Sequence, residues 1–313
     1  MSDKVSKIIA DESSSLIKSG WSRRSFLAGA GVAAAATVVG CGDSGTKMPT
    51  TPPPSNGITD VDILTFALNL EYLEAEYYLR AATGSGLSAT DAGANPGTVT
   101  GGTMVPFTGG VLQQYAIEIA QNELNHVRAL RAAITSAGAT PVSRPNLDFT
   151  NGFNGAASAA GIGSSFNPFG DVNSFLVGAF TFEDVGVTAY SGAAPLISSK
   201  AILTAAAGIQ AVEAYHAGEI RTIIAGSASA PGADQTYLTA ANAISALRAK
   251  LGGGAETTLS ISSIVAADPN TAVGFARMTD AVLHIVYAAG AGVQTKGGFF
   301  PSGLNGKITA TAS

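Results

Sequence analysis

The sequence is poor in charge, in cysteine and in histidine. Charged residues make up 12% of its 313 residues, and it contains one cysteine, Cys41, and three histidines. A single cysteine excludes a disulfide within the chain. Beyond residue 41 there is no basic stripe of the kind that binds nucleic acid, and no segment is long and apolar enough to span a membrane. These features argue against nucleic acid as a partner and against a disulfide-stabilised scaffold.

Apolar residues are abundant instead, at 46% of the chain, and the net charge is −5. This composition allows a large core, in one large domain or two. High alanine content together with little charge favours tightly packed helices with small side chains at their contacts. The 38 glycines are then expected mainly in loops, because glycine weakens the interior of a helix.

Residues 1–41 predict an export leader. Residues 22–27 (Ser-Arg-Arg-Ser-Phe-Leu) form a twin-arginine signal, and an uncharged run follows at residues 28–40. That run is too short to span a membrane comfortably, which argues against a simple membrane anchor.

The end of this leader resembles a lipobox, with Val-Val-Gly-Cys at residues 38–41. Cys41 would then carry a lipid and become the mature N-terminus; ordinary cleavage nearby, with Cys41 lost, is the alternative. We expect a location in the periplasm or cell envelope, with membrane contact only through the N-terminal lipid. Residues 42–57, rich in proline and threonine, predict a stiff, solvated tether.

The remainder of the chain predicts an all-α protein. Apolar periodicity indicates four long helices within residues 58–230 and two more in a C-terminal extension at 231–313, at about 59–82, 110–136, 171–193, 200–225, 234–250 and 269–289. The connections at 83–108 and 139–170 lack periodicity and are expected to be long irregular loops. The tail beyond residue 290 is expected to pack back through Phe299 and Phe300.

A Glu-x-x-His pattern occurs twice, as Glu123 with His126 and as Glu213 with His216. Residues three apart share one face of a helix, so both side chains can reach one metal ion. With 10 glutamates in the chain, two such pairs among three histidines would arise by chance on the order of 0.3% of the time at these composition frequencies. The pattern therefore predicts a metal site.

Two further glutamates, Glu71 and Glu183, lie in apolar helical runs. Each is followed seven residues later by a tyrosine, Tyr78 and Tyr190, which two helical turns bring back to the same face. The order Glu…Tyr, Glu-x-x-His is thus repeated, which indicates an internal twofold repeat of helix pairs. The tyrosines either hydrogen-bond ligating carboxylates across the bundle or are ordinary core aromatics.

One glutamate from each of two helices and a Glu-x-x-His from each of two others is the ligand set of ferritin-like di-iron and di-manganese bundles. Over about residues 58–306 the chain resembles the ferritin-like superfamily. Residues 70–78 (LEYLEAEYY) and 297–306 (GGFFPSGLNG) are similar to exported ferritin-like proteins related to plant desiccation-associated proteins. The resemblance implies a four-helix bundle with long crossover loops and additional C-terminal helices packed on it. The implied metal ligands are Glu71, Glu123, His126, Glu183, Glu213 and His216.

Two positions of this ligand set have alternatives. Glu74 lies one turn from Glu71 on nearly the same face, so it is either the ligand in place of Glu71, a third carboxylate, or a hydrogen-bonding neighbour. Asp184 is the alternative to Glu183.

The other polar residues near these positions are expected to have no metal role. Glu76 points away from Glu71 and is expected to be solvated, and Glu118 and Glu219 are expected on the surface. His284 has Asp280 four residues before it and is expected to be a core or interface histidine.

Buried carboxylates need partners or metal, and two divalent cations would neutralise four of them. Oxygen-rich ligands with one imidazole per metal suit Fe or Mn, with Zn less favoured. The resemblance implies redox activity on O2 or peroxide, of the ferroxidase, catalase or oxidase type. The alternative is a non-catalytic stress or desiccation-related envelope protein with a structural or vestigial metal site; an iron-storing shell is a weaker third. Oligomerisation stays open.

Overall fold

Four helices of 22 to 28 residues dominate the part of the chain that the structure describes. The computed structural model describes residues 57–288, 290 and 292–312. The proposed leader, Cys41 and nearly all of the tether lie outside these residues. The four helices are α3 (Asp60–Thr83), α5 (Val111–Ser136), α7 (Val172–Ala193) and α8 (Lys200–Ser227). The all-α prediction is confirmed.

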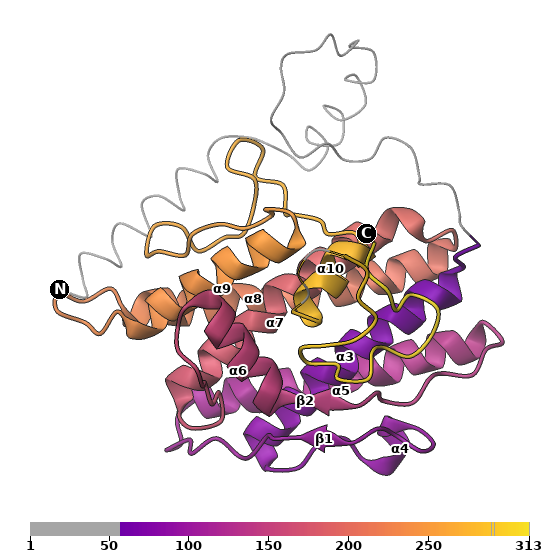
Figure 1. Cartoon of the computed structure of the whole chain (residues 1–313), viewed down its shortest axis with the longest axis horizontal. Helices are drawn as coiled ribbons and strands as arrows, with labels where there is room; N and C mark the ends of the chain where they lie inside the picture. Colours follow the sequence, from indigo (N-terminus) through magenta and orange to yellow (C-terminus); the bar gives the residue numbers. More distant parts are fainter. Residues whose placement is uncertain (1–56, 289, 291, 313) are drawn as a thin grey trace, which may run out of the picture. The chain divides into compact units, whose positions relative to one another are not determined.

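The distribution of apolar side chains decides which helices are interior. Along α3 and α7 buried residues occur on almost every side, whereas α5 and α8 bury a single stripe. A helix that is apolar all round belongs in the core, and one with an apolar stripe covers it. Accordingly α3 packs mainly against α5, and α7 mainly against α8, while α3 also meets α7 and α5 meets α8 (Figure 1).

Side-chain caps fix where α3, α7 and α8 begin. Thr59 accepts a hydrogen bond from the Asp62 amide, and the Asp62 carboxylate accepts one from the Thr59 amide, so the two residues form a capping box. The side chains of Asp171 and Ser199 cap α7 and α8 by accepting a hydrogen bond from the amide three residues on, without the reciprocal bond. The first helix begins within one residue of the start predicted at about residue 59.

The long connections contain regular structure that the sequence analysis treated as loop. The first holds α4 (Ala89–Ala92) and β1 (Val99–Thr100); the second holds β2 (Leu147–Asp148) and α6 (Phe149–Ala160). The two short strands pair in parallel.

The prediction of an irregular segment at 139–170 is therefore wrong for α6. Four glycine and asparagine residues hide its helical character, but Phe149 and Phe153 still fall on one buried face. Gly152 is needed there, because a Cβ would lie 2.4 Å from the ring of Phe299.

The C-terminal part packs on the four long helices. Its elements are α9 (Thr236–Gly252), which contacts α6 and α7, and α10 (Thr279–Val286), which contacts α9 and α7; a short 3-10 turn, η1 (Ala194–Leu196), joins α7 to α8. Phe299 and Phe300 are buried, as predicted for the tail, and the ring of Phe299 lies 4.9 Å from that of Phe182.

The predicted helix at 269–289 is wrong in its first half, since α10 begins at Thr279. The preceding Arg277 lies against α7: its amide donates to the Thr188 carbonyl, and its side chain is buried. The amide of Arg277 therefore bonds to α7 instead of forming a hydrogen bond within a helix of its own.

Buried ion pairs join the C-terminal part to the long helices. Asp184 on α7 accepts hydrogen bonds from Arg221 on α8 and Arg248 on α9. Arg248 also pairs with Glu256, which in turn pairs with Arg277. Each of these charges has an opposite partner, as buried charges require.

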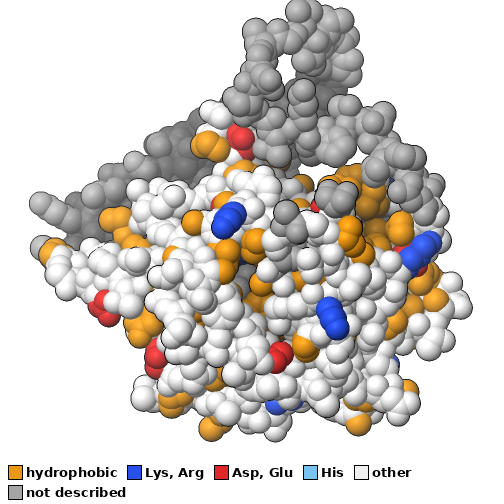
Figure 2. All heavy atoms as spheres, in the orientation of Figure 1, with side chains coloured by type: hydrophobic (Ala, Val, Ile, Leu, Met, Phe, Trp, Pro, Cys, Tyr) orange, Lys and Arg blue, Asp and Glu red, His pale blue; other side chains and the backbone are white. Residues whose placement is uncertain are grey.

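Among the described residues, no helix has the length and apolar character needed to cross a membrane. Figure 2 shows charged side chains scattered singly over the visible face of the described part. That face has no basic stripe.

Candidate metal centre

His126 on α5 faces three glutamates from three helices. Its Nδ1 atom lies 3.1 Å from Glu213 Oε1, 3.2 Å from Glu71 Oε2 and 3.5 Å from Glu123 Oε2. Glu123 comes from the preceding turn of α5, Glu71 from α3 and Glu213 from α8. All four side chains are buried, and one donor atom from each lies within 4.8 Å of the others.

His216 on α8 forms a second, adjacent group. Its Nδ1 atom lies 3.0 Å from Glu123 Oε1 and 3.6 Å from Glu183 Oε2. Glu123 thus presents one oxygen to each histidine and lies between them. The two imidazole rings are 6.2 Å apart between centroids, which brings together two helices that are separated by 63 residues of chain between Ser136 and Lys200.

Glu74 is also at this place. One of its oxygens lies within 4.8 Å of oxygens of Glu183 and Glu213. The absence of a side chain at Gly186 makes room here, since a Cβ would lie 2.4 Å from Glu213 Oε2. All six residues predicted from the sequence therefore converge, and Glu74 joins them. We call this set the carboxylate–histidine cluster: Glu71, Glu74, Glu123, His126, Glu183, Glu213 and His216.

Two tyrosines hold the outer glutamates across the bundle. The Tyr190 hydroxyl on α7 donates to Glu71 Oε1 on α3 at 2.5 Å, and the Tyr78 hydroxyl on α3 donates to Glu183 Oε1 on α7. The arrangement has approximate twofold symmetry, as the repeated sequence pattern predicts. The cross-bundle hydrogen bonds predicted for these tyrosines are confirmed. Each leaves the second oxygen of its glutamate directed at the cluster.

The other atoms of the cluster that could bind a metal ion lack hydrogen-bond partners. Nine buried side-chain nitrogen and oxygen atoms of its members complete no hydrogen bond: Oε2 of Glu71, Glu74 and Glu183, both carboxylate oxygens of Glu123 and Glu213, and Nδ1 of His126 and His216. A buried polar group without a partner costs about 1–3 kcal/mol, and more if it is charged. Native proteins do not accumulate such groups at one point without a ligand. The donor set therefore fits metal ions.

Burial raises the pKa values of most of these carboxyl groups. Burial, and next the charge of Glu123, raise the pKa of Glu71 to about 7, although His126 opposes this. Burial and the neighbouring carboxylates raise the pKa values of Glu74 and Glu213 well above the usual range. In the protein without bound ions these groups therefore tend to keep protons.

The histidines and Glu123 shift in the opposite sense, toward their charged forms. Burial alone would lower the pKa of His216, but the charge of Glu183 and the nearby Glu123 raise it to about 11. Burial likewise disfavours a charged His126, yet Glu71 and the other facing carboxylates raise its pKa above the usual value. Burial would raise the pKa of Glu123, and the two histidines lower it to about 2.

Two other predictions for carboxylates change with the structure. Asp184, the alternative to Glu183, is bound to two arginines and lies outside the cluster. Glu76 was expected to be solvated, and this is wrong: it is fully buried and pairs with Arg80 and with Arg144, 68 residues away. The sequence offers no local sign of that long-range partner.

The residues expected to lie away from the cluster do so. Glu118 is exposed, and His284 is half-buried on α10 with its Nε2 atom 3.7 Å from Asp280 Oδ1. Glu219 is half-buried rather than fully on the surface, and burial, the largest cause, raises its pKa.

Sequence reasoning missed one neighbour of the cluster. The side-chain amide of Asn122 on α5 lies 3.3 Å from Nε2 of His216, on the side of the ring away from the carboxylates. The only sequence signal is its position immediately before Glu123. The matching position before Glu213 is Val212, which offers no polar group.

Comparison with known proteins agrees with this geometry. The ferritin-like domain family matches residues 59–226, which contain the four long helices, except for the last residue of α8, and every member of the cluster. The chain belongs to the ferritin-like family.

Two relatives extend the match beyond that domain. A ferritin-like catalase, Nec2, of Nesocodon mauritianus is 28% identical over 280 residues, which cover 81% of this chain and 86% of that protein. The desiccation-related protein PCC13-62 of Craterostigma plantagineum is 31% identical over 206 residues, covering 62% of this chain and 63% of that protein. The second match thus spans just under two thirds of the relative.

Proposed function

We propose that this ferritin-like protein binds two Fe or Mn ions in the carboxylate–histidine cluster and disproportionates hydrogen peroxide. The observation that carries the proposal is the convergence of nine buried, unpartnered donor atoms on one point of the bundle. We propose Fe and Mn equally, because carboxylate oxygens with one imidazole per ion suit both metals.

The cluster divides naturally into two ion positions. One would be held by His126 with Glu71 and Glu213, and the other by His216 with Glu183; Glu123, which has one oxygen toward each histidine, would serve both. Two ions bound there would supply a couple that accepts and returns two electrons.

The chain itself supplies positioning and a proton. Tyr78 and Tyr190 fix the orientation of Glu183 and Glu71 through hydrogen bonds. In the protein without bound ions, burial and the nearby carboxylates raise the pKa of Glu74 well above its usual range and favour a proton on it. Five carboxylates exceed the charge of two divalent ions by one, and this proton restores the balance. Glu74 can therefore give a proton to a peroxide oxygen and recover it afterwards.

Peroxide disproportionation fits these components without another reagent. One H2O2 molecule is oxidised to O2 and releases two electrons and two protons; a second H2O2 takes up both and becomes two H2O. The relative from Nesocodon mauritianus is named a catalase and matches most of the chain, which supports this reaction over a ferroxidase or oxidase.

The proposal is tested by metal analysis together with O2 evolution. Protein expressed with Fe and Mn supplied should contain two ions per chain and release O2 from peroxide, and His126→Ala should lower the metal content while far-UV circular dichroism is retained. A wild-type protein that holds two ions but releases no O2 would refute the reaction and leave the metal site standing.

A second function is a non-catalytic, desiccation-related role. It is favoured by the 31% identity to a relative named desiccation-related. Protein that binds no ions even after reconstitution would support this role and exclude the first.

Export is part of the proposal. The twin-arginine pair at residues 23–24 would direct the folded chain to the cell envelope, and Cys41 would carry the lipid. Replacing both arginines by lysine should retain the protein in the cytoplasm; unchanged export would show that another signal acts.

A further inference from the structure

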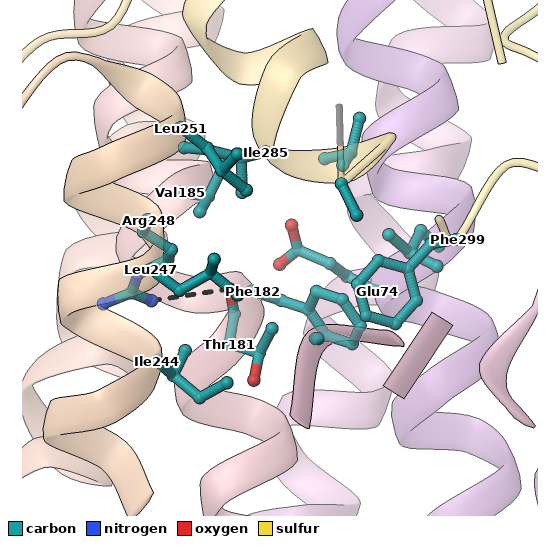
Figure 3. Close-up of a pocket in the computed structure, with 14 residues that line it drawn as sticks. Glu74, Thr181, Phe182, Val185, Ile244, Leu247, Arg248, Leu251, Ile285 and Phe299 are labelled. Atoms are coloured by element: carbon teal, nitrogen blue, oxygen red, sulfur yellow. Dashed lines mark hydrogen bonds between the residues drawn. The ribbon is translucent and has the colours of Figure 1, made fainter. Parts of the chain in front are cut away.

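A cavity of about 30 Å³ lies beside the carboxylate–histidine cluster, where the C-terminal part covers the long helices (Figure 3). Its walls come from α3, α6, α7, α9, α10 and the tail. Most of its lining is apolar, including Leu73, Phe182, Leu247, Leu251, Ile285 and Phe299. The cavity exists because α9 and α10 pack on α7, so it is a product of the C-terminal extension.

Glu74 connects this cavity with the metal centre. Figure 3 shows its carboxylate pointing into the cavity, and its Oε2 atom is buried without a hydrogen-bond partner. The same carboxylate lies within 4.8 Å of Glu183 and Glu213. Arg248 also lines the cavity, but its terminal nitrogens bond to the Phe180 carbonyl, Asp184 and Glu256. Glu74 is thus the one carboxylate on the wall, and it separates the cavity from the ion positions.

The lining decides which small molecule the cavity suits. Water in a protein interior makes two to four hydrogen bonds, and apolar cavities stay dry and take up apolar guests. A volume of about 30 Å³ exceeds the roughly 10–15 Å³ that one water-sized molecule needs, so a diatomic fits. Hydrogen peroxide is polar at both ends and would lose hydrogen bonds on entering.

We propose that this cavity binds dioxygen. The inference rests on the proposed function, because O2 is the product released at the adjoining centre. Of the three small molecules in that reaction, H2O2, H2O and O2, only O2 is apolar. Transfer into the cavity would remove the product from the ions past Glu74, while the polar reactant stays in the polar part of the site. The C-terminal helices then have a direct task in turnover.

Crystals of the chain pressurised with xenon test the site without any metal. Xenon is the probe because it enters dry apolar cavities. We expect an anomalous peak between Phe182, Leu247 and Ile285 in protein with and without bound ions, and O2 pressure should diminish it. Ordered water filling the cavity, or no xenon there, would overturn the inference. Because the xenon peak needs no ions, that result would leave the metal proposal untouched.

A matched pair of variants links the cavity to O2. Ala156 on α6 lines the cavity, and Ala159 on the same helix is exposed. Ala156→Leu should abolish the xenon peak and slow O2 release from peroxide at equal metal content, whereas Ala159→Leu should change neither. If Ala156→Leu does not fold, Leu247→Phe on α9 serves in its place. O2 release at the wild-type rate from protein with a filled cavity would overturn the role in turnover.

Discussion

At the scale of single residues, the twofold symmetry of the cluster is broken beside the histidines, as it is at Glu74, whose matching position on α7 is Gly186. Asn122 reaches Nε2 of His216, whereas His126 has Val212 at the matching position on α8. The Asn122 atom at 3.3 Å from Nε2 is the amide nitrogen. An ion bound at Nδ1 leaves the ring proton on Nε2, and the amide then accepts that proton by turning over to present its oxygen. Such a contact fixes the tautomer and orientation of a ligating histidine. Asn122 should therefore strengthen the binding of the ion beside His216 and have no such effect on the ion beside His126.

Asn122→Val should weaken the binding of one ion and spare the other. The expected loss is about 10–100-fold in affinity, the usual cost of removing a partner of a ligating histidine. Stepwise dissociation constants from calorimetry on metal-free protein measure it. Asn125→Val is the control, because Asn125 is exposed on the same helix and its side chain accepts a hydrogen bond from Gln121 rather than contacting the cluster. Equal affinities in the two variants would refute this role of Asn122.

The site residues that could be predicted are those identified by their spacing along one helix. Glu123 and His126 share one helix face, and Tyr78 repeats the face of Glu71 after two turns, so spacing alone identifies them. Asn122 bonds across to α8 and Glu76 bonds to Arg144. Both contacts depend on tertiary structure that no local pattern encodes.

At the scale of elements, α7 is shaped by the glycines on its inner face. A Cβ at Gly186 would lie 2.4 Å from Glu213 Oε2, and one at Gly192 would lie 1.9 Å from the Arg277 carbonyl oxygen. Glycine costs about 1 kcal/mol relative to alanine within a helix. At Gly186 the missing side chain leaves room for Glu213 in the cluster. At Gly192 it lets the C-terminal segment approach α7 closely.

Gly186→Ala should weaken metal binding without unfolding the protein. The new methyl group meets the flexible end of Glu213, so the carboxylate moves away while the helix gains propensity. Gly208→Ala on α8 is the control, since a Cβ there meets no atom within 4 Å; it should add up to about 1 kcal/mol of stability and leave metal binding unchanged. Metal titrations and urea unfolding of both variants give the comparison. Wild-type affinity in Gly186→Ala would contradict the spatial argument.

The elements most visible in the sequence are those with continuous apolar patterns. The four long helices were predicted within about two residues of their observed bounds because each has a capping residue, a glycine or a proline close to its ends. In contrast, α6 is hidden by Asn151, Gly152, Asn154 and Gly155, and its helical form depends on packing against Phe299. The early part of the predicted last helix was lost to the backbone bond between Arg277 and Thr188.

At the scale of the whole molecule, the cluster makes stability depend on pH. In the metal-free protein the pKa of Glu71 rises from 4.5 to about 7, and that of His216 from 6.5 to about 11. A group whose pKa is raised by folding stabilises the folded state fully at pH values below its pKa in the unfolded chain. That stabilisation is lost as the pH rises through its pKa in the folded protein. Glu71 therefore loses its contribution between about pH 4.5 and 7, and His216 between about 6.5 and 11. Glu123, lowered to about 2, contributes above pH 4.5 and loses its contribution only on acidification.

Metal-free protein should consequently become less stable as the pH rises from 5 to 8. The expected fall in the free energy of unfolding is on the order of 1–3 kcal/mol. Urea unfolding at four pH values in this window measures it. Metal-loaded protein should show the reverse trend, because ion binding displaces the protons and strengthens with pH. A metal-free protein that gains stability over this range would contradict the assigned shifts.

The central claim is that four helices bring two histidines and their glutamates together to hold a pair of ions. The most direct measurement is anomalous scattering at the Fe and Mn absorption edges from a crystal of the metal-loaded chain. Our account predicts two peaks about 3.5–4 Å apart, one next to Nδ1 of His126 and the other next to Nδ1 of His216. A crystal of metal-containing protein with no peak between these histidines, or with its ions elsewhere on the chain, would contradict it.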